Sequence, residues 1–177
     1  MKEIKALRKL NKHPNVIKIK EMVRKNEDVF IVFEFCERNL YQEMQERASS
    51  NKPFSEEEIK NIMVQLISAV LYIHRNNYMH RDIKPENFLV LEAIDSIHSL
   101  GAQKMQLKLA DFGLAKDLSE SGQGGHTDYV STRWYRAPEL LLRSSNYTQA
   151  VDIFALGCIM AELYLGRPIF PGNSESD

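Results

Sequence analysis

The stretch His80-Arg81-Asp82-Ile83-Lys84-Pro85-Glu86-Asn87 decides how the rest of this 177-residue chain is interpreted. It is followed by Asp111-Phe112-Gly113 and then by Ala137-Pro138-Glu139. A lone Asp-Phe-Gly would more often be a turn than a metal site. Here a long octet and two shorter motifs occur together in a fixed order, so coincidence is a poor explanation.

These motifs resemble the catalytic core of eukaryotic protein kinases, and the Lys-Pro-Glu-Asn form of the octet is similar to the serine/threonine branch. The resemblance implies that Asp82 orients a substrate hydroxyl and that Lys84 stabilises the transferring phosphoryl group. Asn87 and Asp111 would supply hard oxygen ligands to Mg²⁺ bound with ATP. The implied reaction moves the γ-phosphate of ATP to serine or threonine hydroxyls of proteins.

The length limits how much of such a domain this sequence can supply. A kinase catalytic domain has two lobes, whereas this chain has the length of about one domain. The implied fold is therefore α+β, a truncated two-lobed kinase fold that is mainly the helical C-terminal lobe. Residues 1–36 would form a remnant of the N-terminal lobe with one helix, two strands and the hinge. Residues 37–177 would form an incomplete C-terminal lobe.

Composition favours a cytosolic protein. The formal net charge is −1, and the charges of both signs are interspersed, so no basic field favours nucleic acid or an anionic membrane. Cys36 and Cys158 lie far apart in a chain without a signal-peptide pattern, so we expect reduced thiols. The apolar run 151–165 is interrupted by acidic residues and is too short to span a bilayer. Nucleus and cilium stay open as further compartments.

The first ten residues are expected to form an amphipathic helix, because Ile4, Leu7 and Leu10 recur at helical spacing. The resemblance makes this the C-helix, in which Glu3 would pair with the nucleotide-binding lysine. A solvated surface glutamate is an equally open alternative. Residues 11–15 are expected to turn, because a proline disfavours helix at the residue before it.

Residues 16–22 and 29–35 are β-branched and aromatic runs, and the polar residues 24–28 between them are typical of a hairpin turn. The resemblance makes Phe33 the gatekeeper of the nucleotide site, although it is also expected to be an ordinary core aromatic. Backbone groups of Glu34 and Cys36 would then bind the adenine.

Two helices are expected before the octet. Residues 39–47 predict a short polar helix, and Ser55 with Glu58 forms the signature of a capping box at the start of a longer one. His74 near the end of that helix is interpreted as a helix-terminus histidine. The longer helix is expected to bury one apolar face, made by Ile59, Ile62, Met63, Leu66, Ile67, Val70 and Leu71.

Residues 88–90 and 107–110 predict short strands on either side of an insertion at 91–106, whose role the sequence does not indicate. Residues 151–165 predict a further apolar helix that ends before a Gly-Arg-Pro sequence. The resemblance makes Asp152 the residue that anchors the backbone of the catalytic loop.

The segment before Ala137 resembles the dual-phosphorylation activation loop of mitogen-activated kinases. With an aspartate between Thr127 and Tyr129, it is most similar to the male-germ-cell-associated and intestinal-cell kinase family of the CMGC group. A phosphate on Thr127 would be neutralised by Arg81 and Lys116, and an upstream kinase would add it. The alternative is that both are ordinary loop residues.

Three more residues of this segment have expected roles. A phosphate on Tyr129 would pair with Arg133 and Arg136. The resemblance also connects Arg136 with a preference for proline after the target residue. It makes Thr132 a contact of the catalytic Asp82 and of Lys84. The expected partners are protein substrates and the upstream kinase, without nucleic acid or membrane, and the expected state is a monomer.

The resemblance covers the chain but not a whole kinase domain. Neither a Gly-rich loop nor the strand lysine that holds phosphates is expected in these residues, and the C-terminal helices of the family are not expected in them either. Two hypotheses follow, a serine/threonine kinase and an inactive kinase-like docking module. Retention of Asp82, Lys84, Asn87 and Asp111 favours the kinase, because a docking module needs none of these groups.

Overall fold

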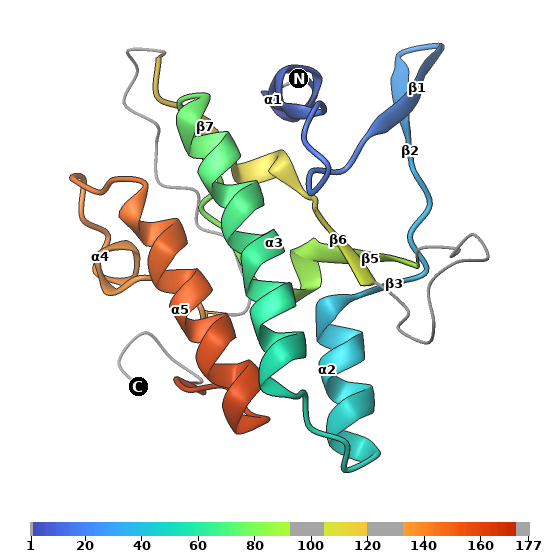
Figure 1. Ribbon diagram of the computed structural model, residues 1–177. Coiled ribbons are helices and arrows are strands. Elements are labelled where there is room, and N and C mark those ends of the chain that lie inside the picture. The colour runs from blue at the N-terminus through green and yellow to red at the C-terminus, as the bar shows by residue number, and fades with distance from the viewer. Residues whose placement is uncertain (1, 93–104, 120–132, 173–177) are drawn as a thin grey trace.

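The computed structural model describes residues 2–92, 105–119 and 133–172 (Figure 1). Its α-helices are α1 (Lys2–Leu10), α2 (Leu40–Ser49), α3 (Glu56–Arg75), α4 (Pro138–Leu141) and α5 (Ala150–Leu165). Its strands are β1 (Ile19–Lys25), β2 (Asp28–Phe33), β3 (Arg38–Asn39), β4 (Tyr78–Met79), β5 (Phe88–Glu92), β6 (Met105–Leu109) and β7 (Lys116–Asp117). Single 3-10 turns cover Pro85–Asn87 and Phe112–Leu114.

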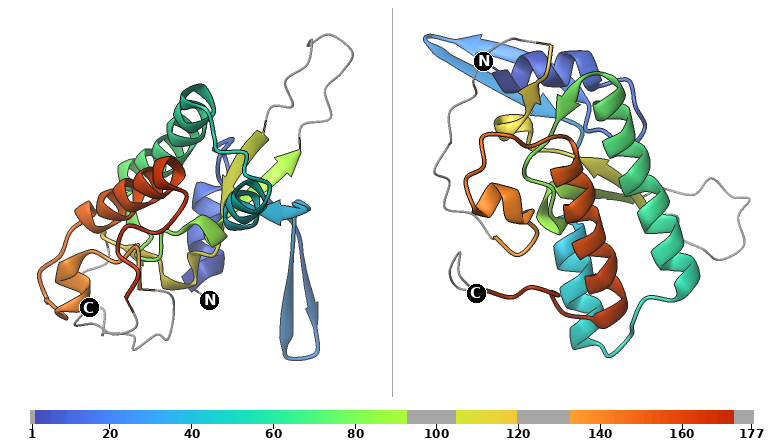
Figure 2. Two further views of the ribbon diagram at one scale, coloured as in Figure 1. Left: turned by 90° about the horizontal axis from the view of Figure 1, so that it is seen from below. Right: turned by 90° about the vertical axis from the view of Figure 1, so that its left-hand side faces the viewer.

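The strands that are described form small antiparallel sheets: a β1-β2 hairpin, a β3-β5-β6 sheet and a β4-β7 pair. Helices α3 and α5 pack side by side, and the left view of Figure 2 shows the hairpin projecting away from them. The helical part is therefore the larger body, and the hairpin with α1 is attached to it. This arrangement is the mixed α+β architecture that the sequence predicted.

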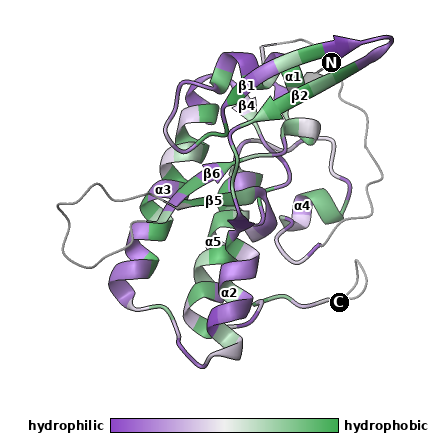
Figure 3. Cartoon of the chain, turned by 90° about the vertical axis from the view of Figure 1, so that its right-hand side faces the viewer, coloured by the Kyte–Doolittle hydropathy of each residue, from purple (hydrophilic) through white to green (hydrophobic). Residues whose placement is uncertain are grey.

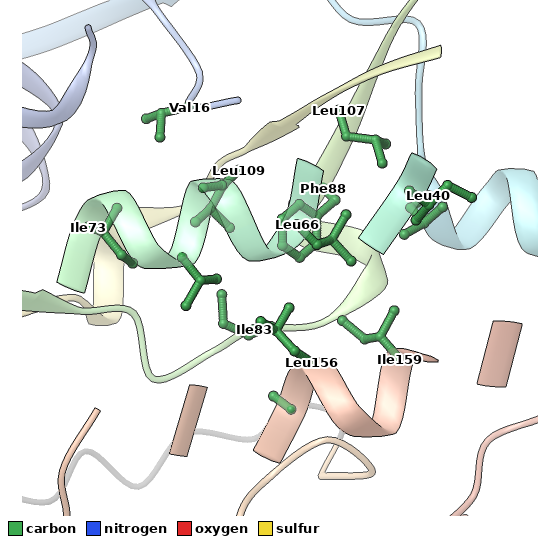
Figure 4. Packing of buried hydrophobic residues seen from close by; sticks show 14 of the residues in the cluster. Val16, Leu40, Leu66, Ile73, Ile83, Phe88, Leu107, Leu109, Leu156 and Ile159 are labelled. Atoms are coloured by element: carbon green, nitrogen blue, oxygen red, sulfur yellow. The ribbon is translucent and has the colours of Figure 1, made fainter. Parts of the chain in front are cut away.

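The hydrophobic core joins α3, α5, α1 and the β3-β5-β6 sheet. Figure 4 shows side chains of α3, α5, β5 and β6, together with Leu40 of α2, gathering between the two long helices and the strands. The largest fully buried side chains are Leu7, Leu10, Ile17, Leu40, Ile62, Leu66, Ile73, Met79, Phe88, Leu107, Leu109 and Phe112. Each buried apolar side chain of this size contributes about 1.5–3 kcal/mol. The octet directly follows β4, and its Ile83 belongs to this core.

Helix α3 begins at the predicted capping box. The Ser55 hydroxyl accepts the Glu58 N–H at 3.3 Å, and Ser55 N–H donates to Glu58 Oε2 at 2.8 Å. The predicted apolar face is partly wrong, since Ile67 and Leu71 are 48% and 44% exposed and Ile73 is buried. The described neighbours of α3 cover one narrow stripe only, so an apolar residue beyond that stripe stays in contact with solvent.

Helix α2 confirms the polar helix expected at 39–47 and adds a second capping box. Asn39 is its N-cap: its side chain accepts the Gln42 N–H, and the Gln42 side chain accepts the Asn39 N–H, both at 2.9 Å. This pairing satisfies two of the backbone donors that every helix start leaves free. It therefore fixes the start of α2, at which the chain passes from the segment after β2 into the helical lobe.

The expected hairpin exists, but its boundaries were wrong. Strand β1 continues to Lys25 and β2 already starts at Asp28, so the turn is only Asn26-Glu27, with Asn26 at φ 57°. Asparagine tolerates this left-handed conformation better than most residues. Figure 3 shows the hydrophobic character of β2, and its Phe30 is 54% exposed.

The segment expected to start the first strand pairs elsewhere. Val16 forms a parallel bridge with Leu109 of β6, where Ile17 N–H donates to the Leu109 carbonyl at 2.9 Å and Leu109 N–H donates to the Asn15 carbonyl at 2.8 Å. The bridge holds the segment between α1 and the hairpin against the strand that leads to Asp111. Tertiary pairing thus overrides the local strand signal.

The insertion expected at 91–106 is shorter than predicted, because β5 and β6 extend into it with pairs Leu91↔Gln106 and Glu92↔Met105. The remainder, 93–104, lies outside the described residues. Helix α5 confirms the predicted apolar helix and ends at Gly166, whose φ of 69° suits a helix end. None of the described helices is long and apolar enough to cross a bilayer.

A second anchor of the N-terminal segment is His13, which links it to α3. Asn15 N–H donates to His13 Nδ1 at 3.1 Å, and the other ring nitrogen contacts the Ser68 hydroxyl at 3.2 Å. The ring also stacks on Tyr72 at 4.7 Å between centroids. Burial, and then the charge of Lys108, lowers the pKa of His13 below its ordinary value. The contacts therefore require the uncharged ring.

Replacing the N-cap Ser55→Ala is expected to lower the free energy of unfolding by about 1 kcal/mol, because the Glu58 N–H loses its acceptor. Urea unfolding measures the change. Ser49→Ala is the matched control, since the Ser49 hydroxyl donates to a carbonyl and caps no N–H. That change should stay within about 0.5 kcal/mol. Equal losses in the two variants would contradict the capping assignment.

Stability is expected to fall as the pH drops below about 6.5, the ordinary value for histidine. The unfolded chain then binds a proton at His13 that the folded chain, with its lowered pKa, does not yet bind. The stability that His13 contributes is therefore present above pH 6.5 and is lost as the pH falls through its folded pKa. Urea unfolding of the protein and of His13→Gln should converge toward acid pH. A difference independent of pH would contradict this assignment.

Candidate active site

The octet is held by the buried carboxylate of Asp152, in the first turn of α5. Its Oδ1 accepts the Arg81 N–H at 2.8 Å, and its Oδ2 accepts the His80 N–H at 2.9 Å. The same Oδ2 lies 2.7 Å from His74 Nε2. Asp152 is only 1% exposed, so these bonds replace the water that a buried carboxylate loses. His74 thus does more than end its helix, which was its predicted role.

This anchor supports an unusual backbone at Arg81, whose φ is 70°. A residue other than glycine rarely adopts the left-handed region, and doing so costs of order 1 kcal/mol unless its surroundings hold it there. Arg81 is held at its N–H by Asp152 and at its side chain, where Nε donates to the Leu114 carbonyl at 2.7 Å. The strained residue directly precedes Asp82.

Two predicted site residues, Lys84 and Asn87, contact a third, Asp82, which is 7% exposed. The Lys84 ammonium lies 2.8 Å from Asp82 Oδ2. The Asn87 amide donates to the Asp82 carbonyl at 2.8 Å and to Oδ2 at 3.2 Å. The 3-10 turn Pro85–Asn87 brings Asn87 back toward Asp82. The structure therefore brings the base candidate, the cation and the amide together.

The residues predicted to hold metal fit a Mg²⁺ ion in their donor atoms. Because Asn87 Nδ2 is used by Asp82, its Oδ1 is left as a possible ligand. Ala110 N–H donates to the Asn87 carbonyl at 2.9 Å, so the Asp111 that follows lies beside it in an adjoining segment. Asp111 is exposed and sits at φ 57°, with Oδ1 accepting the Gly113 N–H at 3.3 Å.

Two protein oxygens are few for a metal site that the protein builds alone. Among the described residues, no group of three or more His, Cys, Asp or Glu side chains converges as a metal site would require. Mg²⁺ commonly takes one or two protein ligands and completes its octahedron with phosphate oxygens and water. The donor set at Asn87 and Asp111 therefore suits magnesium that arrives with a nucleotide.

His80 joins the octet to the segment that contains Asp111. The Asp82 N–H points to His80 Nδ1 at 3.4 Å, so the proton lies on Nε2, which donates to the Ala110 carbonyl at 3.0 Å. The ring meets Phe112 edge-on at 5.1 Å between centroids. His80 therefore packs between the octet and the segment that contains Asp111.

Of the predicted hinge residues, Phe33 ends β2, and Glu34 and Cys36 follow it at the base of the hairpin. Phe33 and Cys36 are half-buried and pack against the core. Glu34 N–H donates to the Lys18 carbonyl at 3.0 Å, so of its two backbone groups the carbonyl is the one left for a ligand. Burial, and then the charge of Glu34, raises the pKa of the Cys36 thiol, while Lys108 opposes this shift. Cys36 is therefore not an activated nucleophile.

The whole chain, residues 1–177, matches the family model of the protein kinase domain. The chain belongs to the protein kinase family. This match also confirms the predicted fold class.

Three relatives place this kinase chain within its family. Cyclin-dependent kinase F-3 of Oryza sativa subsp. japonica is 50% identical over all of this chain and 37% of its own length. Serine/threonine-protein kinase MAK of Homo sapiens is 50% identical and is covered over 26% of its length. Serine/threonine-protein kinase ICK of Mus musculus is 48% identical over 25% of its length. The predicted resemblance is confirmed, and the chain spans between 25% and 37% of these relatives.

The residues predicted to regulate the kinase are only partly described. Arg81 Nη1 donates to the Tyr147 hydroxyl at 3.1 Å, and Lys116 Nζ lies 5.8 Å from the centroid of the same ring. Arg81 and Lys116, the two cations expected to neutralise a phosphate on Thr127, thus both contact Tyr147. Tyr147 was not predicted to belong to the site. Glu3 lies in the first turn of α1.

Arg136 lines the same small pocket as Asp82 and Lys84. Arg133 and Arg136 are joined by a turn in which Arg136 N–H donates to the Arg133 carbonyl at 3.0 Å. The remaining predicted residues of this segment lie outside the described residues: Thr127, Tyr129 and Thr132.

Sequence reasoning missed a buried pair at this pocket, which Tyr135 helps to line. Tyr135 donates its hydroxyl hydrogen to Glu162 Oε2 at 2.6 Å, and burial raises the pKa of both groups. It also missed Gln149, whose amide donates to the carbonyls of His74 and Tyr78 at 3.0 Å each. The available sequence signal was a polar residue at an apolar helix, since Glu162 lies inside α5 and Gln149 directly precedes it.

Changing Asp152→Asn is expected to lower the free energy of unfolding by about 3 kcal/mol, because the new amide presents hydrogen to a backbone N–H that needs an acceptor. Urea unfolding followed by circular dichroism checks the loss. Asp28→Asn, at an exposed strand end, is the matched control and should change stability by less than about 0.5 kcal/mol. Equal stability of the two variants would contradict the role of Asp152.

Proposed function

We propose that this protein is a serine/threonine protein kinase that transfers the γ-phosphate of ATP to hydroxyl groups of protein substrates. The observation that carries the proposal is the arrangement at Asp82, whose carboxylate meets the Lys84 ammonium at 2.8 Å and the Asn87 amide at 3.2 Å. Phosphoryl transfer needs positioning and electrostatic stabilisation more than covalent chemistry by the protein. This arrangement supports both needs.

Asp82 would accept the hydrogen bond of the attacking hydroxyl and take its proton. The position of Asp82 is fixed by Asn87, whose side-chain amide donates to both the carbonyl and Oδ2 of Asp82. Lys84 would neutralise negative charge that develops on the transferring group. Since Lys84 is paired with Asp82 before substrate arrives, its side chain is already placed beside the reacting hydroxyl.

ATP with Mg²⁺ would supply the phosphoryl group and a Lewis acid that neutralises its charge. Asn87 Oδ1 and the Asp111 carboxylate would hold the ion, with Phe33, Glu34 and Cys36 next to the base. Asp111 is exposed, which supports a ligand that comes from solvent with the nucleotide.

Specificity and regulation are proposed from the residues around the pocket. Arg136 lies beside Asp82 and would favour substrates with proline after the target residue. Phosphates on Thr127 and Tyr129 would be added by an upstream kinase and would engage the nearby arginines and Lys116. Thr132 would contact Asp82. A monomer acting in the cytosol, nucleus or cilium is part of the same proposal.

The direct test is transfer of labelled phosphate from ATP to a Ser-Pro peptide. Asp82→Asn is expected to lower turnover about a hundredfold or more while ATP still binds, because the base is lost and the metal ligands remain. Asp28→Asn is the control at a remote site. Full turnover by Asp82→Asn would contradict its role. A folded protein without ATP binding or transfer would favour the docking-module alternative.

Proline direction is tested with the same peptide carrying Ser-Ala in place of Ser-Pro. The proposal predicts a kcat/KM at least about tenfold higher for Ser-Pro, and a smaller ratio for Arg136→Ala. Equal use of the two peptides by the unmodified protein would contradict proline direction without affecting the assignment of Asp82.

A further inference from the structure

An ion pair between buried Lys108 and half-buried Glu34 joins the predicted hinge to the strand that leads into the predicted metal site. Lys108 in β6 is 2% exposed, and its ammonium lies 3.2 Å from Glu34 Oε1. Among the described residues it is the only buried lysine or arginine. A buried ammonium is costly to desolvate, so its placement calls for an explanation.

The two partners belong to the two halves of the proposed nucleotide site. Glu34 directly follows β2 and lies in the stretch expected to bind the adenine. Lys108 precedes Asp111 by three positions in the chain. The pair therefore connects the place where the base would bind to the segment that would hold the metal and phosphates.

A third segment closes this connection into a ring. Glu34 Oε1 also accepts the Lys18 N–H at 2.9 Å, and the Lys18 carbonyl accepts the Glu34 N–H at 3.0 Å. The residue before Lys18 is bound to Leu109 of β6 through the Ile17 N–H at 2.9 Å. Glu34 is thus bound to β6 twice, directly through Lys108 and indirectly through this backbone.

Stability is a weak explanation for the pair. Replacing a buried ion pair by apolar groups of similar volume is often neutral or stabilising, so the geometry that the pair selects is the alternative explanation pursued for Glu34 and Lys108. The backbone hydrogen bonds at Lys18 and Ile17 hold the segments together through main-chain atoms. The direct contact between a hinge side chain and a β6 side chain is made by Glu34 and Lys108. The charge of Lys108 is also felt at Cys36, the other proposed hinge contact.

We propose that Glu34 and Lys108 are positioning residues for nucleotide binding. Their ion pair sets the distance between the adenine-binding backbone at 34–36 and the segment that contains Asp111. This inference rests on the proposed function. One ATP molecule must reach both segments at once, so its affinity depends on how well their spacing is set before it binds. The peptide substrate is expected at Asp82 and does not depend on this spacing.

The test compares Lys108→Met with Lys108→Arg in binding of a fluorescent ATP analogue with Mg²⁺ and in steady-state kinetics. Lys108→Met is expected to raise the Kd for the analogue and the KM for ATP about fivefold or more. The KM for the Ser-Pro peptide should not change. Lys108→Arg keeps the charge and should stay within about twofold of the unmodified protein. Lys20→Met, an exposed lysine of β1, is the matched control.

A double variant, Glu34→Gln with Lys108→Met, removes both charges so that neither is left buried alone. It is expected to unfold thermally no earlier than Lys108→Met and still to bind ATP weakly. Unchanged ATP affinity in Lys108→Met and in the double variant would overturn the positioning role. A parallel rise in the KM for ATP and the KM for the peptide, together with lost stability, would also overturn it. If the unmodified protein is folded but binds no nucleotide, the proposed function fails first, and this inference fails with it.

Discussion

The buried carboxylate of Asp152 is the interaction on which the rest of the site depends. It accepts the N–H groups of His80 and Arg81 and contacts His74, so it ties α5 to the end of α3 and to the start of the octet. A carboxylate this deep is tolerated only when such bonds replace its water. Their directions then hold Arg81 at a positive φ, and that backbone aims Asp82 toward Lys84 and Asn87. This one buried charge thus sets the backbone geometry on which the proposed chemistry at Asp82 depends.

The same principle joins the smaller N-terminal part to the helical body. Apolar packing supplies most of the stabilisation but little direction, whereas each junction is set by a buried polar group. Asn15 donates its side-chain amide to the Leu107 carbonyl at 2.8 Å and to Gln65 Oε1 at 3.0 Å. Glu34 and Lys108 perform a comparable task beside the hinge. Such groups must find their partners or lose stability, so they select one arrangement of the segments.

The features that were predictable from sequence depend on local spacing. The Ser55 capping box, the long helices and the catalytic motifs are all visible within a few residues, and the family match confirms the fold that they implied. The errors arose where distant segments decide. Val16 was expected in the first strand of the hairpin but pairs with β6. Leu71 was expected to be buried but is exposed, because no described neighbour covers it. The bond between His74 and Asp152 joins residues far apart in the chain, and no local pattern announces it. The positive φ at Arg81 was equally invisible, because the usual signal for it is glycine.

We propose that the anchored octet and the segment after β6 form one nucleotide-metal site. The most direct measurement is a crystal structure with a non-hydrolysable ATP analogue and Mn²⁺ in place of Mg²⁺, in which anomalous scattering locates the ion. We expect Mn²⁺ to be bound by Asn87 Oδ1 and the Asp111 carboxylate, with the adenine against residues 34–36. An ion bound to other carboxylates, or an analogue bound away from Asp111, would contradict it.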